Sequence, residues 1–167
     1  MSKAFTDEEA GEDAPIVAPR APLPPGVPNY VTARGLARLR EELAALQGER
    51  ARADALANEK QRGRALGALT QRRVALERRI ATAELVRPPS ESLERVRFGA
   101  AVTVAGAGGE RRYEIVGVDE ADPAIGKLAF TSPLARALIG RAAGDSVRLY
   151  TPRGPEDVEI TAVAYGD

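Results

Sequence analysis

Residues 32–46 read TARGLARLREELAAL. The leucines of this stretch, Leu36, Leu39, Leu43 and Leu46, follow a 3-4-3 spacing that puts all four on one stripe of an α-helix. Thr32 stands just before the stripe, and threonine is favoured at a helix N-cap. The stretch therefore predicts an amphipathic helix that begins after Thr32.

A second helical stripe follows, ahead of the pair Pro88-Pro89. Its positions are Leu66, Leu69, Arg73, Leu76, Ile80 and Ala83. Because proline cannot continue a helix, we expect the proline pair to stop this helix. Two heptad-spaced stripes joined by a short polar segment fold most economically into an antiparallel coiled coil. The sequence thus predicts a helical hairpin over residues 29–89, with its turn near Leu56–Gly63.

The last part of the chain changes from a helical period to alternation of apolar and polar residues, which is typical of strands. The predicted strands are residues 101–104, 112–116, 127–130, 146–150 and 158–163. One short helix is expected among them, capped by Ser132, opened by Pro133 and stopped by Gly140. The predicted fold class is α+β, with the hairpin followed by a small, mostly antiparallel β domain over residues 90–167.

Charge is distributed unevenly although the whole chain is neutral. Residues 1–28 carry a net charge of −3 and six prolines, which predicts a disordered acidic, proline-rich tail. Residues 29–89 carry +6 and residues 90–167 carry −3. The opposite charges of the tail and the hairpin suggest that the tail masks the basic end of the hairpin.

The far end of the hairpin is strongly basic, because residues 50–73 hold seven basic and two acidic residues. The basic tip residues singled out are Arg50, Arg52, Lys60, Arg62 and Arg64. Such a tip can attract nucleic-acid or nucleotide phosphates or an acidic protein surface, and the alternative is a solvated helix surface without a partner. No aromatic residue interleaves these side chains to stack on bases.

Composition excludes several classes of chemistry, because the chain of 167 residues has no His and no Cys. The usual zinc and haem ligands, thiol nucleophiles and disulfides are therefore absent. We predict no catalytic residues, no metal site and no cofactor of the chain's own. Without a long apolar run, a soluble, cytoplasmic monomer that does not bind membranes is expected. The acidic run Asp119, Glu120 and Asp122 is expected to be a surface turn.

Four segments match a known family in order: residues 31–43, 96–104, 113–122 and 132–140. On these segments the chain resembles the bacterial Gre transcript-cleavage factors. The resemblance implies an elongation regulator that binds bacterial RNA polymerase. It also implies a C-terminal domain with an FKBP-like fold, which docks at the rim of the secondary channel through positions matching Thr131, Ser132 and Pro133. The isomerase activity of FKBP enzymes is not implied, because a fold alone carries no activity.

The tip departs from that family, whose acidic tip motif helps to hold a catalytic magnesium ion of the polymerase. This chain lacks the motif, and its hairpin is shorter by about seven residues per arm, or about 10 Å of reach. We therefore predict a regulator without cleavage stimulation. One alternative keeps cleavage, with Asp54 and Glu59 assisting the polymerase-bound Mg²⁺. Another is a protein-interaction regulator like the short-armed Gre relatives linked to nucleoside diphosphate kinase.

Overall fold

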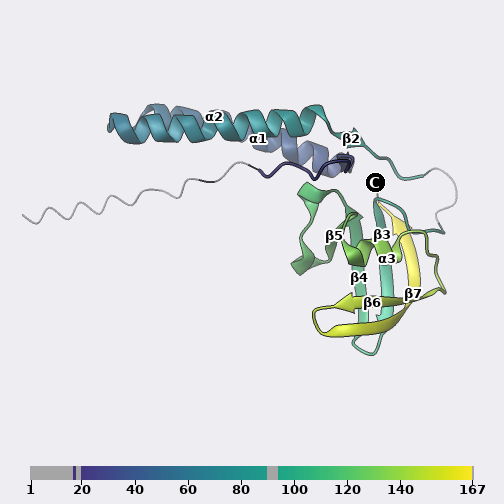
Figure 1. The fold of residues 1–167 in the computed structure, drawn as a ribbon. Helices are drawn as coiled ribbons and strands as arrows, with labels where there is room; N and C mark the ends of the chain where they lie inside the picture. Colours follow the sequence, from purple (N-terminus) through teal and green to yellow (C-terminus); the bar gives the residue numbers. More distant parts are fainter. Residues whose placement is uncertain (1–16, 18–19, 90–93, 167) are drawn as a thin grey trace, which may run out of the picture.

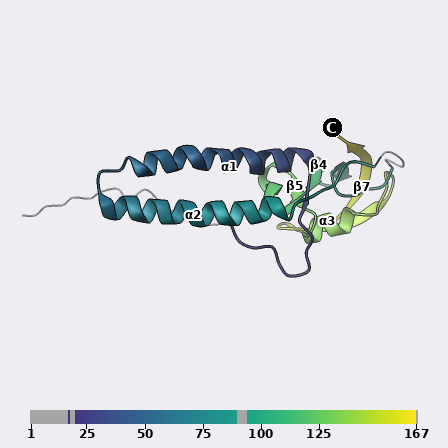
Figure 2. The same cartoon turned by 90° about the horizontal axis from the view of Figure 1, so that it is seen from above.

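The computed structural model describes Val17 and residues 20–89 and 94–166. Two long helices, α1 and α2, lie side by side and project from a small β domain (Figures 1 and 2). This α+β arrangement confirms the predicted fold class. No helix in these ranges is long and apolar enough to cross a membrane.

The hairpin consists of α1 (Ala33–Asp54) and α2 (Glu59–Ala81), which run antiparallel. The predicted N-cap is confirmed, because the Thr32 hydroxyl accepts a hydrogen bond from the Gly35 amide. The leucine stripes meet in one core that includes buried Leu39, Leu46 and Leu76. The turn is shorter than predicted, because Asn58 caps α2 and Gly63 already lies inside that helix.

The base of the hairpin contains a small sheet that the sequence patterns did not predict. Strand β1 (Tyr30–Val31) pairs in parallel with β2 (Glu84–Leu85). The chain therefore leaves the helical conformation after Ala81, and Thr82 is the C-cap. The expectation that Pro88-Pro89 ends this helix was wrong, because pairing with β1 draws the chain into an extended conformation before the prolines are reached.

The β domain contains five strands in the order β5-β4-β3-β7-β6. Their bounds are β3 (Ala100–Gly106), β4 (Gly109–Val116), β5 (Lys127–Ala129), β6 (Ser146–Thr151) and β7 (Gly154–Tyr165). All neighbours are antiparallel except β4 and β5, which are parallel. The five predicted strands are thus all present, with bounds that extend a few residues beyond the predicted ones in β3, β4 and β7.

One short helix, α3 (Pro133–Leu138), packs on the core of this domain through Ala135 and Leu138. Its predicted cap is confirmed, since the Ser132 hydroxyl accepts from the Ala135 amide. Gly140 follows with a φ of +86°, a conformation that glycine adopts without strain. Two 3₁₀ turns, η1 (Val118–Glu120) and η2 (Pro123–Ile125), connect β4 to β5.

Candidate functional site

The hairpin and the β domain meet at a joint built around Glu120, whose side chain reaches the start of α1. Its carboxylate accepts two hydrogen bonds from Thr32, one from the backbone amide at 2.9 Å and one from the hydroxyl at 2.5 Å. Glu120 is 9% exposed. A buried carboxylate costs free energy unless its oxygens are hydrogen-bonded, and Thr32 supplies both partners. The N-cap of α1 is thereby tied to η1 of the β domain.

Two glycines allow this close approach. A Cβ atom at Gly35 would lie 2.1 Å from the carboxyl carbon of Glu120, and one at Gly117 would lie 2.4 Å from the carbonyl oxygen of Tyr30. At Gly117 the neighbour is backbone, so the position needs glycine for space, whereas a side chain at Gly35 would displace the end of the Glu120 side chain. Gly35 lies in the first turn of α1, just after the cap and before the first leucine of the stripe. Its position there is a sequence feature that could have predicted close packing.

Asp119 contributes a second set of contacts to the joint. Its carboxylate lies 2.8 Å from Arg20 Nε and 3.4 Å from Arg79 Nε. The Asp119 and Arg79 side chains are only 8% and 7% exposed. The prediction of a surface turn was wrong for Asp119 and Glu120, which face the hairpin. Charge alone did not reveal this, since the partners lie about 40 to 100 residues away along the chain. Asp122 is exposed and caps η2, as expected of a surface turn.

The end of the predicted tail also belongs to the joint. Arg20 Nη2 lies 2.9 Å from Glu42 Oε2 on α1, and Arg79 donates a hydrogen bond to the carbonyl of Ala21. Asn29 is buried and donates to the carbonyl of Arg79 at 2.7 Å. The prediction of a disordered tail therefore needs correction for residues 20–28, which are held against the hairpin by these contacts. Residues 1–16 and 18–19 lie outside the described residues.

An aromatic cluster connects the joint to the start of α3. The rings of Tyr30, Phe98 and Phe130 lie with their centroids 5.3 to 5.8 Å apart. Edge-to-face pairs at such distances stabilise one another beyond simple burial. Tyr30 belongs to the hairpin base, whereas Phe130 directly precedes the predicted docking positions 131–133. Residues 131–133, the predicted docking positions, thus lie beside the base of the hairpin, at a defined position relative to it.

The three predicted docking residues have different environments. Ser132 uses its hydroxyl to cap α3, so its side chain has a structural role. Thr131 is half-buried and Pro133 is exposed. Pro133 therefore offers the most accessible side chain of the three for a partner.

The predicted basic tip lies at the other end of the hairpin from the joint (Figures 1 and 2). An α-helix of the length of α1 spans about 33 Å. Arg62 donates to the carbonyl of Leu56 at 2.9 Å and so closes the turn, while Arg50 lies 4.0 Å from Asp54. Within the described part of the chain, Arg52, Lys60 and Arg64 form no ion pair. The tip therefore presents an excess of positive charge to solvent.

Asp54 and Glu59 flank the turn, as the last residue of α1 and the first of α2. The Asp54 side chain is 55% exposed. Glu59 lies in the first turn of α2, where a carboxylate interacts favourably with the helix dipole. The described ranges contain no cluster of three or more acidic residues that could hold a metal ion. The structure brings the two carboxylates to the same end of the hairpin without a third ligand.

Comparison with known proteins identifies the family. A model described as the C-terminal part of transcription elongation factor GreA/GreB matches residues 90–165. A transcription elongation factor GreA from Methylobacterium sp. (strain 4-46) is 37% identical over 155 residues, which cover 81% of this chain and 96% of that protein. The chain belongs to the GreA/GreB family of transcription elongation factors.

Other GreA/GreB relatives match over a smaller part. GreA from Anaeromyxobacter sp. (strain K) is 46% identical over 88 residues, covering 52% of this chain and 53% of that protein. GreA from Acidiphilium cryptum (strain JF-5) is 42% identical over 93 residues, covering 54% of this chain and 59% of that protein. The chain thus spans about half the length of these curated relatives.

Two solved structures from the GreA/GreB family align over most of their length. GreA factor homolog 1 (Gfh1) of Thermus thermophilus is 20% identical with a TM-score of 0.39, and covers 81% of this chain and 97% of its own. GreA/GreB from Nitrosomonas europaea is 22% identical with a TM-score of 0.41, and covers 81% and 98%.

Proposed function

We propose that this chain binds bacterial RNA polymerase at the secondary channel and regulates elongation without supplying carboxylates for transcript cleavage. Membership of the GreA/GreB family supports the role in elongation. The observation that carries the proposal is the chemistry of the tip, where the basic residues Arg50, Arg52, Lys60, Arg62 and Arg64 accompany only Asp54 and Glu59. Arg72 and Arg73, farther along α2, pair with Glu49 and Glu77.

The tip chemistry disfavours a role in metal-assisted cleavage. Mg²⁺ prefers hard oxygen ligands, and a surplus of positive charge repels it. The same surplus attracts the phosphates of a nucleotide or of RNA, with a strength that falls as salt is added. We infer that the tip obstructs the channel or contacts phosphates there.

The joint supports a mode of action in which docking of the β domain sets the position of the hairpin tip. The β domain would dock through Thr131 and Pro133, and the adjacent Tyr30–Phe98–Phe130 cluster would fix the direction of the hairpin. Glu120 would hold the start of α1 in the same orientation. A partner that binds the docking segment would therefore also set where the tip lies.

The decisive experiment measures RNA 3′-end cleavage in purified backtracked elongation complexes with Mg²⁺, after binding has been confirmed on the same sample. We expect binding without stimulated cleavage. Stimulated cleavage that Asp54→Asn/Glu59→Gln abolishes would support the alternative in which these carboxylates, which flank the turn, assist the metal. No binding to the polymerase would overturn the proposal and favour a different protein partner.

A docking variant tests the surface used. Pro133→Glu changes an exposed residue at the first position of α3, where a carboxylate is compatible with the helix N-terminus. We expect it to weaken polymerase binding while the circular dichroism spectrum stays unchanged. The matched control is Glu159→Ala, at an exposed position on β7, which should bind as the parent chain does. Equal binding by both variants would place the docking surface elsewhere.

A further inference from the structure

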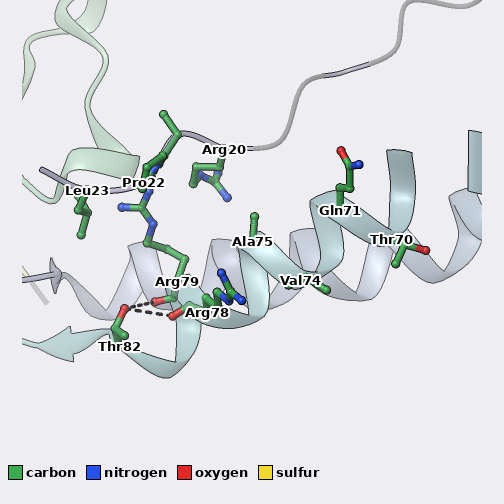
Figure 3. A pocket seen from close by; sticks show the side chains of 11 residues that line it. Arg20, Pro22, Leu23, Thr70, Gln71, Val74, Ala75, Arg78, Arg79 and Thr82 are labelled. Carbon is green, nitrogen blue, oxygen red and sulfur yellow. Dashed lines mark hydrogen bonds between the residues drawn. The ribbon is translucent and has the colours of Figure 1, made fainter. Parts of the chain in front are cut away.

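A groove runs along α2 on the side where the chain enters the hairpin. Its volume is about 610 Å³, and it lies between residues 20–23 and the face of α2 from Thr70 to Thr82. Figure 3 shows Arg20 and Pro22 over Ala75 and Arg79, with Thr70 farther along α2 toward the tip. The groove therefore begins at the anchored segment and extends toward the basic tip.

Apolar surface is left uncovered both in this groove and next to its entrance. Val74 of α2 lines the groove and is 37% exposed. Val17, three residues before Arg20, is 57% exposed. Its neighbours in sequence, Ile16 and Ala18, are also apolar. Burying such side chains against the groove would be favourable by the hydrophobic effect.

The anchor fixes where the preceding residues start. Arg20 is held by ion pairs to Asp119 and Glu42, and Ala21 accepts a hydrogen bond from Arg79. Arg79 lies near the base end of α2. Residues 1–19 are therefore tethered beside their own hairpin, and a contact with it within the same chain has a high effective concentration.

Charge and length both match this segment to the tip. Residues 1–19 hold five carboxylates and one lysine, a net charge of −4, against +5 over residues 50–73, where Arg72 and Arg73 are paired with Glu49 and Glu77. The carboxylates lie seven to thirteen residues before Arg20, a reach of about 23–43 Å for extended chain. Arg72 and Lys60 lie about 11 Å and about 29 Å from Arg79 along α2 at 1.5 Å per residue. The acidic residues can therefore lie opposite the basic half of the hairpin.

We propose that residues 1–19 bind along the α2 groove of the same chain, with the apolar residues 16–18 in the groove and the acidic residues 7–13 against the basic tip. In this arrangement the segment shields the tip from other anions. The contact occurs within the free protein, so it does not depend on the proposed binding to polymerase.

The absence of cysteine makes the test direct, because one introduced thiol carries the only label. A nitroxide on Ala10→Cys, inside the acidic cluster, broadens the amide signals of nearby residues in the ¹⁵N-labelled full chain. We expect broadening concentrated at residues 50–73 at about 0.1 M salt and its loss at about 1 M, where the Debye length falls from about 10 Å to about 3 Å. A nitroxide on Arg153→Cys, in the exposed β6–β7 turn, is the control and should leave the tip signals sharp.

Two variants identify the interactions. Replacing all five carboxylates with amides (Asp7→Asn, Glu8→Gln, Glu9→Gln, Glu12→Gln, Asp13→Asn) should remove the broadening of the tip. Val74→Glu should weaken it by repelling the segment from the groove. Broadening spread evenly over the molecule, or unchanged in the amide variant, would overturn the proposal. Unchanged broadening in Val74→Glu would show that the segment does not bind in the groove.

A mixing experiment separates contact within one chain from contact between copies. Spin-labelled protein without ¹⁵N is added to ¹⁵N-labelled protein without a spin label. Sharp tip signals in the mixture support the intramolecular contact, and broadened ones would show that the occupant is a second copy. As a readout of shielding, the amide variant should bind a single-stranded oligodeoxythymidylate about tenfold more tightly than the parent at low salt. Equal affinity would argue against shielding of the tip.

Discussion

The two ends of the hairpin differ in how they are built. At the base, Glu120 and Asp119 make buried polar contacts to α1, α2 and the segment before them, and Gly35 and Gly117 leave room for this packing. At the tip, Arg52, Lys60 and Arg64 are exposed, and no ion pair to them is found in the described ranges. The difference shows that the base sets the orientation of the hairpin, whereas the tip can change its charge without changing the fold.

Gly117→Ala should disturb the base most strongly. The added Cβ would overlap the carbonyl oxygen of Tyr30, and backbone cannot move aside easily. We expect the free energy of unfolding, measured in urea, to fall by about 2–3 kcal/mol, as is typical of overpacked sites. Gly67→Ala on α2 is the control, because nothing lies within 4 Å of its Cβ and alanine is the better helix former. If the free energy of unfolding falls no further in Gly117→Ala than in Gly67→Ala, close packing at Gly117 would be contradicted.

Glu120→Ala tests the polar half of the joint. It leaves the partly buried Thr32 amide without its carboxylate acceptor, and we expect the unfolding free energy to fall by about 2 kcal/mol. Glu159→Gln, at an exposed carboxylate on β7, should change the unfolding free energy little. Should both variants unfold at the same urea concentration, the Thr32 contact would not contribute to stability.

Asn58→Ala removes the N-cap of α2, which is the only side-chain cap at the tip among the described residues. The Asn58 side chain accepts from the Gln61 amide at 3.0 Å, and its loss should cost about 1 kcal/mol in unfolding free energy. Asn58→Asp is the control, since aspartate caps a helix equally well. Similar losses in both variants would mean that the cap is not the reason for the effect.

The triple variant Arg52→Gln/Lys60→Gln/Arg64→Gln should have the smallest effect on folding. These side chains are exposed, so we expect the unfolding free energy to stay within about 0.5 kcal/mol of the parent value. Binding of a single-stranded oligonucleotide should weaken, and its dependence on salt should become shallower. A large loss of stability would show that the tip charges have structural partners.

Local sequence patterns predicted most of the elements. The leucine spacing located both helices, the caps Thr32 and Ser132 were placed correctly, and the apolar alternation located all five strands of the β domain. These features depend on residues within one or two turns or along one strand, so they can be read without the rest of the chain. The parallel pair β1–β2 escaped prediction because each strand has only two residues, too few to show a period.

The candidate site divides in the same way. Charge composition alone indicated the basic tip, because its excess of arginine and lysine needs no partner to be recognised. The joint could not be predicted, because Glu120 and Thr32 are 88 residues apart, and an acidic run looks the same whether it is solvated or buried.

The sequence by itself therefore determined the two helices, the strands, their order along the chain and the positive charge at the tip of the hairpin. Only the tertiary structure decided which carboxylates are buried, that Gly117 is required for space, and how residues 20–28 are held. The physical reason is the range of the interactions: helix periodicity and charge surplus are local properties, whereas desolvation and close packing depend on which distant segments meet.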